Sequence, residues 1–466
     1  MNSAPAMQTD RQGNAVTNAS HGAIAAIDHL AGQWLGYGNE MARFFESLQA
    51  YPECAQLNMM GAVLILSMED GTANPQAAGM LAAAASQERS LNERETMMLA
   101  AMRAWSAGEI DRALAQHVAM AEKYPRDLFA MKTGQLHAFN LGDNEAILHL
   151  ADLALADNRD NHFVHGMRAF GLEQCHRLDE AEEEARTAIA MDRNDPWAHH
   201  ALAHVMETQG RLDEGVAWMS AMADTWENCK SFMYTHNWWH MALFLIDRDE
   251  TAEALALYDK RVWGVWKEFS QDQINAVSLL ARLEMRGVDV GERWKDVATY
   301  LKPRLHEHIN PFLDLQYLYG LARAGERAAV AEMLASLEAH AEQAKPFARR
   351  AWQDAALPAA HALAAHAMGD WNGAVQGLSA ALPHLQAIGG SHAQRDLFEQ
   401  LHLDALMRAE WNARALAILE ARDRARPNVP ALKRGLAEIN RRLGHGETAA
   451  RYGAEAEQWR RRYRAA

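Results

Sequence analysis

A turn-like segment returns along this sequence at a fixed interval of 34 residues. Gly108, Gly142, His176 and Gly210 follow one another at this spacing. They open the polar or acidic turns GEIDRA, GDNEA, HRLDEA and GRLDEG, each of which ends on a small residue. Three successive equal intervals indicate a structural repeat, because unrelated turns would not keep this phase.

The residues between the turns predict helices. Alanine, leucine, glutamate, arginine and methionine dominate, and apolar residues recur at spacings of three and four. A helix–turn–helix unit with a 34-residue period is the tetratricopeptide repeat. The sequence therefore predicts an all-α fold, a right-handed tetratricopeptide-repeat solenoid of about nine or ten helix pairs with a central concave pocket.

The phase slips in the second half of the chain, but the turns continue. Asp249, Gly369, Glu410 and Gly444 match the turn pattern, and a looser unit surrounds Gly325. Prolines near the ends of several units stop the second helix, because proline lacks an N–H and clashes with the preceding turn.

Composition and phase together predict five segments. The first residues are small and polar and cannot bury enough surface to offset the entropy of ordering. The apolar stretch MMGAVLILSM indicates a buried capping helix pair, as expected for an atypical end unit. The predicted order is a flexible lead over 1–22, a helical capping region over 23–93, regular repeats with the histidines over 94–260, irregular repeats over 261–368, and C-terminal repeats with a cap over 369–466.

Net charge and cysteine usage limit the partners. A net charge of −15 repels phosphates and anionic lipid, so we expect neither nucleic acid nor membrane as a partner. No apolar run approaches the roughly 20 residues of a membrane helix. The cysteines, Cys54, Cys175 and Cys229, form no CxxC pair, which favours a reducing compartment and a cytoplasmic location.

Four histidines lie at helical spacing on two successive predicted helices. His200 and His204 are one turn apart, as are His236 and His240, and Glu207 continues the first row. Because neighbouring helices pack about 8–10 Å apart, the four imidazoles can converge on one site.

Three interpretations of this cluster stay open. Two histidines with Glu207 could ligate a transition metal, and any of the four histidines is a candidate ligand. One histidine could instead act as a general base, oriented by Glu207 or Glu173. The histidines could also pack as repeat scaffolding. The HExxH pattern of metalloproteases is absent from HALAH and HNWWH.

The same helix faces carry aromatic residues, as in small-molecule sites with apolar walls and few polar groups. Three further candidates lie elsewhere in the sequence. Asp272 follows an aromatic stretch, and His392 and Arg395 follow a Gly-Gly-Ser segment that begins a helix. The predicted binding residues are Trp197, Phe170, Glu173, Trp239, Phe139, Lys132, Asp272, His392 and Arg395.

Several segments resemble the tetratricopeptide repeat protein 38 family. They include PECAQLNMMGAV, DPWAHHALAHVMETQGRLDEGVAWM, WENCKSFMYTHNWWH and IGGSHAQRDLF, and the likeness covers most of residues 40–420. The resemblance implies an all-helical cytosolic repeat protein and supplies no reaction. Gln316 departs from the family pattern, in which a histidine is common at this position of the FLDLQ segment.

The leading functional prediction is recognition of a small molecule or short peptide in the histidine- and aromatic-lined pocket. The alternative is an enzyme of hydrolase or lyase type that uses His200, His204, His236, His240 and Glu207 for acid–base or metal-assisted chemistry. A protein–protein scaffold ranks third, because the predicted concave face carries only Lys132 as a cation. A homodimer is compatible with this architecture.

Overall fold

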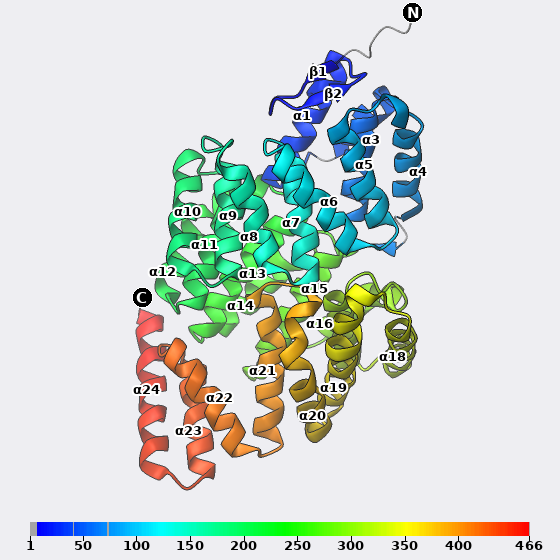
Figure 1. Ribbon diagram of the computed structural model, residues 1–466. Coiled ribbons are helices and arrows are strands. Elements are labelled where there is room, and N and C mark those ends of the chain that lie inside the picture. Colours follow the sequence, from blue (N-terminus) through cyan, green and yellow to red (C-terminus); the bar gives the residue numbers. More distant parts are fainter. Residues whose placement is uncertain (1–6, 41, 72–73, 466) are drawn as a thin grey trace, which may run out of the picture. The chain divides into compact units, whose positions relative to one another are not determined.

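The computed structural model describes residues 7–40, 42–71 and 74–465. The regular secondary structure of these residues is almost entirely helical (Figure 1). The strands among them are β1 (Met7–Thr9) and β2 (Ala15–Thr17). The α-helices are α1 (His21–Gly36), α2 (Ala42–Ala50), α3 (Ala55–Leu66), α4 (Asn74–Ala85), α5 (Glu93–Ser106), α6 (Ile110–Lys123), α7 (Leu128–Leu141), α8 (Asn144–Leu155), α9 (His162–Gln174), α10 (Leu178–Met191), α11 (Pro196–Thr208), α12 (Leu212–Met222), α13 (Ser231–Asp247), α14 (Thr251–Leu257), α15 (Ser270–Met285), α16 (Arg293–Leu301), α17 (Pro311–Arg323), α18 (Arg327–Glu342), α19 (Leu357–Met368), α20 (Trp371–Ala381), α21 (His392–Arg408), α22 (Asn412–Ala425), α23 (Pro430–Arg442) and α24 (Gly446–Ala465).

Left-handed residues end the first helix of each predicted repeat. A helix commonly stops at such a residue, and glycine adopts this conformation without steric cost. Gly287, between α15 and α16, has the same conformation and was missed by the sequence analysis. The prediction of the turns is confirmed, since φ is positive at Gly108, Gly142, His176, Gly210, Asp249, Gly325, Gly369, Glu410 and Gly444.

Small residues let the helices of the repeats approach closely. Ala113 and Ala181, five residues after their turns, are fully buried. At Gly215 a Cβ atom would lie 2.3 Å from the Phe244 ring, so a larger residue could not fit without displacement. The chain is therefore all-α and built from helix pairs of the tetratricopeptide type, as predicted.

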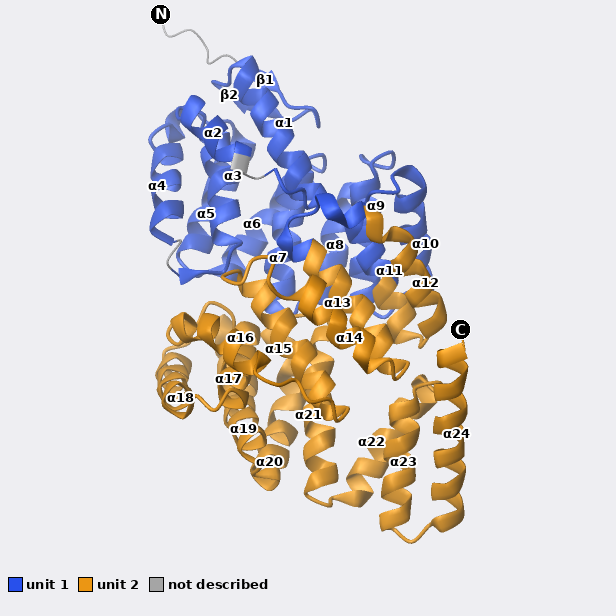
Figure 2. Ribbon diagram, turned by 180° about the vertical axis from the view of Figure 1, so that it is seen from behind, with its two compact units in different colours: residues 1–202, 225–233 blue, residues 203–224, 234–466 orange. Residues whose placement is uncertain are grey.

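The chain divides into two compact units, which Figure 2 distinguishes by colour. Unit 1 comprises residues 1–202 and 225–233, and unit 2 comprises residues 203–224 and 234–466. The division falls within α11 and α13. The five segments of the sequence analysis have other boundaries and stay a prediction.

Unit 1 begins with a β-hairpin in place of the expected flexible lead. Gln8 pairs with Val16 in the antiparallel ladder, and the Val16 side chain is fully buried. The Thr17 amide donates to the Glu95 carboxylate at 2.9 Å, and Asn92 Nδ2 donates to a hairpin carbonyl. These bonds to α5 order a segment whose composition alone would not. Residues 1–6 lie outside the described residues.

The helix predicted from MMGAVLILSM is α3, and every one of its residues is buried. It belongs to a hydrophobic core cluster of unit 1 that also includes residues of α1, α4, α5 and α7. Unit 2 contains α12 and α14 to α24 and most of α13. In the described part of the chain, no helix is both long and apolar enough to span a membrane.

Candidate functional site

Three of the four predicted histidines lie together in unit 2. His204 is on α11, and His236 and His240 are one turn apart on α13. Their side chains are at most 2% exposed. The helical spacing places His236 and His240 on one face of α13, as the sequence predicted.

The three imidazoles contact one another. The ring centroids of His204 and His240 are 4.5 Å apart, and those of His236 and His240 are 4.8 Å apart in an edge-on arrangement. One ring nitrogen from each histidine lies within 4.8 Å of the others. The cluster therefore brings three nitrogen donors to one buried point.

Polar side chains of α13 and α15 orient His236. The His236 Nδ1–H donates to Asn275 Oδ1 at 3.0 Å, because that oxygen can only accept. Thr235 Oγ1 lies 3.4 Å from Asn275 Nδ2 and donates to Asp272 Oδ1 at 2.8 Å. Asp272, a predicted binding residue, thus acts on the cluster through Thr235 and Asn275. The arrangement leaves Nε2 as the basic nitrogen of His236.

Glu207 contacts His240 at 3.3 Å, through Nδ1 of the ring. This contact corresponds to the orienting role that was predicted for Glu207 as an alternative to metal ligation. Burial raises the pKa of Glu207 to about 8, lowers that of His236 to about 4 and lowers that of His204 well below its usual value. His204 and His236 are therefore neutral near pH 7, the form that donates a lone pair.

The other predicted residues of unit 2 lie around this cluster. The Trp239 ring stacks on His236 at 5.1 Å, with 9° between the planes. His392 is close enough for its charge to lower the pKa of His204. The guanidinium of Arg395 donates to the carbonyl of Gly389 at 3.2 Å, so it fixes the turn before α21.

One cation near the cluster was missed by the sequence analysis. Arg282 on α15 is 2% exposed, and its guanidinium lies 5.5 Å from the Trp239 ring centroid. It also donates to the Ala393 carbonyl at 2.7 Å. The repeat pattern does not predict the position of Arg282, because the 34-residue period is already lost in this part of the sequence.

The predicted aromatic residues of unit 1 form a continuous row. Phe139 and Phe170 are 6.0 Å apart between centroids, and Phe170 and Trp197 are 4.7 Å apart. His200, one turn before His204 on α11, packs on Trp197 at 4.5 Å. Tyr37, which was not among the predicted binding residues, extends the row by stacking on Trp197 with 5.3 Å between the ring centroids.

The two charged residues predicted in unit 1 have different surroundings. Lys132 Nζ donates to the carbonyls of Trp34 and Leu35, each at 2.8 Å, at the end of α1. Glu173 is fully buried, and its carboxylate accepts from the neighbouring Gln174 amide. Glu173 belongs to unit 1, and the orienting role considered for it stays a prediction.

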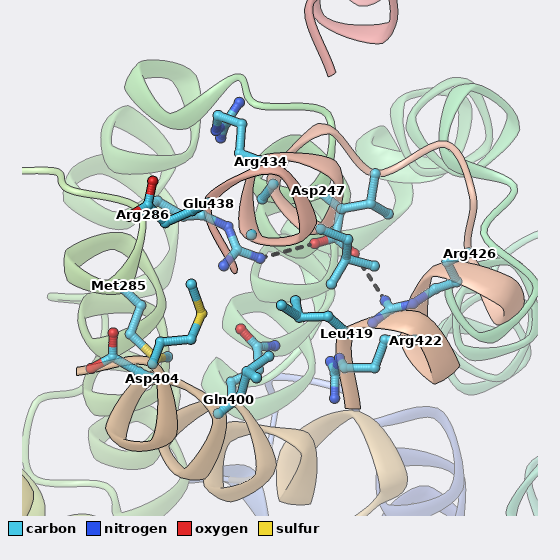
Figure 3. Close-up of a pocket in the computed structure, with 16 residues that line it drawn as sticks. Asp247, Met285, Arg286, Gln400, Asp404, Leu419, Arg422, Arg426, Arg434 and Glu438 are labelled. Carbon is cyan, nitrogen blue, oxygen red and sulfur yellow. Dashed lines mark hydrogen bonds and ion pairs between the residues drawn. The ribbon is translucent and has the colours of Figure 1, made fainter. Parts of the chain in front are cut away.

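Unit 2 also contains a polar cleft of about 280 Å³ lined by none of the predicted residues (Figure 3). Asp247 contacts Arg426 at 2.9 Å and Arg286 at 3.5 Å, as the dashed lines show. Arg422 pairs with Asp396 at 2.7 Å. The arginines are thus matched by carboxylates, and the cleft has no evident preference for one sign of charge.

Comparison with known proteins gives no family for this chain. No family model matches the chain. The chain is similar to human IFIT1 in a dimer with PPP-AAAA, at 12% identity and a TM-score of 0.42 over 97% of this chain and 95% of that one.

Two further solved structures are similar at the same level. One is a Rap protein complexed with Competence and Sporulation Factor, at 10% identity and a TM-score of 0.38 over 88% of this chain and 99% of that one. The other is yeast Tom70, at 14% identity and a TM-score of 0.35 over 75% and 88%. Such distant likenesses concern the fold alone, and the helical-repeat assignment rests on the helix pairs described above.

Proposed function

We propose that this chain is a helical-repeat binding protein that holds a divalent transition-metal ion on His204, His236 and His240 and recognises a small molecule or short peptide at that ion. The observation that carries the proposal is the convergence of three buried ring nitrogens within 4.8 Å. Imidazole suits zinc, copper, iron and nickel, and zinc sites with three protein ligands keep one position for water or a ligand.

The groups behind the rings support a metal ion. Histidine ligands commonly bond a carboxylate or carbonyl oxygen through their other nitrogen, which fixes the tautomer and the ring plane. Asn275 has this relation to His236, and Glu207 has it to His240. Zinc-bound imidazole nitrogens lie about 3.3 Å apart, as follows from Zn–N distances of about 2.0–2.1 Å. A small rotation of the rings would therefore complete the site.

The test is metal content per chain, measured by mass spectrometry on untagged protein after dialysis against zinc. We expect close to one ion per chain in the native protein and a large loss in His236→Ala and His240→Ala. His402→Ala is the matched control, since His402 is a buried histidine of unit 2 that contacts Ser379 instead of the cluster. Equal metal content in the His236→Ala and control variants would refute the proposal.

A second candidate function is hydrolysis or lyase-type acid–base chemistry at the same histidines. The contact between Glu207 and His240 favours it at pH values above the raised pKa of Glu207, about 8, because a carboxylate that orients an imidazole is the usual partner of a general base. Turnover separates the two functions. A binder returns its ligand unchanged, whereas in an enzyme His204→Gln loses kcat while the substrate still binds.

We also propose a family, the absence of nucleic acid as a partner and a cytoplasmic location for this protein. The family assignment rests on the residues that resemble the tetratricopeptide repeat protein 38 family. The absence of nucleic acid as a partner rests on net charge alone and gains no support from the comparisons. The cytoplasmic location rests on cysteine usage, and the protein–protein scaffold stays the third candidate.

A further inference from the structure

We infer that unit 1 contains an oxyanion site between the ammonium groups of Lys132 and Lys230, suited to a carboxylate or phosphate ester with a flat apolar body. The residues that carry this inference all belong to unit 1, and none is a proposed metal ligand. Its test is therefore independent of the metal site.

Two ammonium groups share one aromatic ring. Lys132 Nζ lies 3.4 Å from the Tyr37 ring centroid, and Lys230 Nζ lies 5.2 Å from the same centroid. Lys230 also lies 5.1 Å from the Trp34 ring, and Lys132 lies 6.0 Å from it. Two cations thus meet at one aromatic cage.

Lys132 has a structural role that explains its burial. Trp34 and Leu35 are in the last turn of α1, where backbone carbonyls lack helical partners. The Lys132 ammonium, 7% exposed as a residue, donates to both carbonyls and keeps a third N–H. Lys230 has no comparable role, since no hydrogen bond or ion pair of its ammonium is found within the described residues.

The cage is rich in donors and poor in acceptors. The indole Nε1 atoms of Trp34 and Trp197 are buried, and no hydrogen-bond partner for either is present in the part of the chain that the structure describes. The Trp197 ring lies 6.0 Å from Lys132 Nζ. A buried donor without a partner carries a desolvation cost, which an oxyanion would remove.

The nearby carboxylate is already used. Asp195 Oδ1 accepts from the amides of Trp197 and Ala198, each at 3.0 Å, and Oδ2 contacts His162 Nδ1 at 2.8 Å. Asp195 therefore caps α11. Its single negative charge is the counter-charge for two lysines. Burial lowers the pKa of Lys230 to about 8, and burial together with the charge of Lys230 lowers the pKa of Lys132 well below its usual value.

The aromatic side chains beside the lysines favour an apolar body for the rest of the ligand. Tyr37 stacks on Trp197, and Phe170 and Phe139 continue the row. Aromatic rings next to cationic groups favour a molecule with a ring and an anionic group. Carboxylates and phosphate esters share this chemistry.

The test is calorimetric titration of the full-length protein with benzoate, phenyl phosphate and benzamide at constant ionic strength. Benzamide has the shape of benzoate without its charge. We expect at least one of the two anions to bind at least tenfold more tightly than benzamide, and the tighter anion then identifies the ligand class.

Lys230→Met should weaken binding of that anion at least tenfold while the circular dichroism spectrum stays native. Lys230 is half-buried and does not cap α1, so its replacement leaves the fold intact. Lys267→Met is the matched control, because Lys267 also lies over two aromatic rings but is paired with Asp296 at 2.7 Å.

Three results would overturn the inference. They are equal binding of the better anion and benzamide, binding that Lys230→Met leaves unchanged, and no binding of either anion at millimolar concentration. Metal content is expected to be the same in Lys230→Met as in the native protein, so a failure here is distinguishable from a failure of the metal proposal.

Discussion

Two buried histidines of unit 1 predict a specific sensitivity to acid. His117 on α6 and His137 on α7 are fully buried, with ring centroids 5.3 Å apart. Neither ring makes a hydrogen bond that is found among the described residues. Burial lowers the pKa of His117 from 6.5 to about 4, and the Asp127 carboxylate only partly opposes this shift.

The sign and size of the effect follow from linkage. Above pH 6.5 His117 is neutral in both the folded and the unfolded chain, so its contribution to stability is fully present. As pH falls toward about 4, the unfolded chain takes up a proton that the folded chain does not. A pKa of about 4 in the folded chain against 6.5 in the unfolded chain corresponds to a loss of about 3 kcal/mol over this window.

His117→Phe removes the titrating group and keeps a buried aromatic ring. Hydrogen–deuterium exchange of peptides from α6 and α7, corrected for intrinsic exchange rates, measures local stability without assuming two-state unfolding. Between pH 7 and pH 4.5 we expect native protection to fall by on the order of a hundredfold more than in the variant. His149→Gln, an exposed histidine of α8, should behave as native. Equal acid sensitivity in the native protein and His117→Phe would refute the reasoning.

Three substitutions test the fold. Glu410 has an exposed side chain and a φ of 60°, so Glu410→Gly should raise the free energy of unfolding by about 1 kcal/mol in urea; a loss would contradict this. Gly171→Ala would place a Cβ 2.7 Å from the Leu148 Cα and should lower stability by about 1–3 kcal/mol, whereas Gly79→Ala meets nothing within 4 Å and should not. Arg94→Met would leave Asp127, 2.6 Å away, without its buried partner, and should cost about 3–5 kcal/mol in thermal or urea unfolding; a loss below about 1 kcal/mol would contradict that pairing.

The helical repeat was predictable because local rules determine it. A helix followed by a tight turn needs a left-handed residue, and glycines at a fixed period mark these positions. The period also locates the two positions where His176 and Glu410 stand in place of glycine. The convergence of His204, His236 and His240 was predictable for the same reason, since helical periodicity defines the face of a side chain. Gly287 was missed because the period no longer holds there.

The remaining features depend on contacts between distant parts of the sequence. The hairpin is ordered by Asn92 and Glu95, which lie 77 and 78 residues after their partners in the chain, and composition alone does not predict such contacts. The cage around Lys230 joins the end of α1 to the segment before α13, where neither lysine nor tyrosine follows the repeat.

The most direct test of the central claim is the X-ray absorption spectrum of the zinc-loaded protein at the zinc edge. Coordination by His204, His236 and His240 predicts a first shell of nitrogen and oxygen only, at about 2.0–2.1 Å, with the outer-shell scattering of about three imidazoles. A sulfur shell at about 2.3 Å, or a spectrum unchanged in His236→Ala, would place the metal elsewhere and contradict the account.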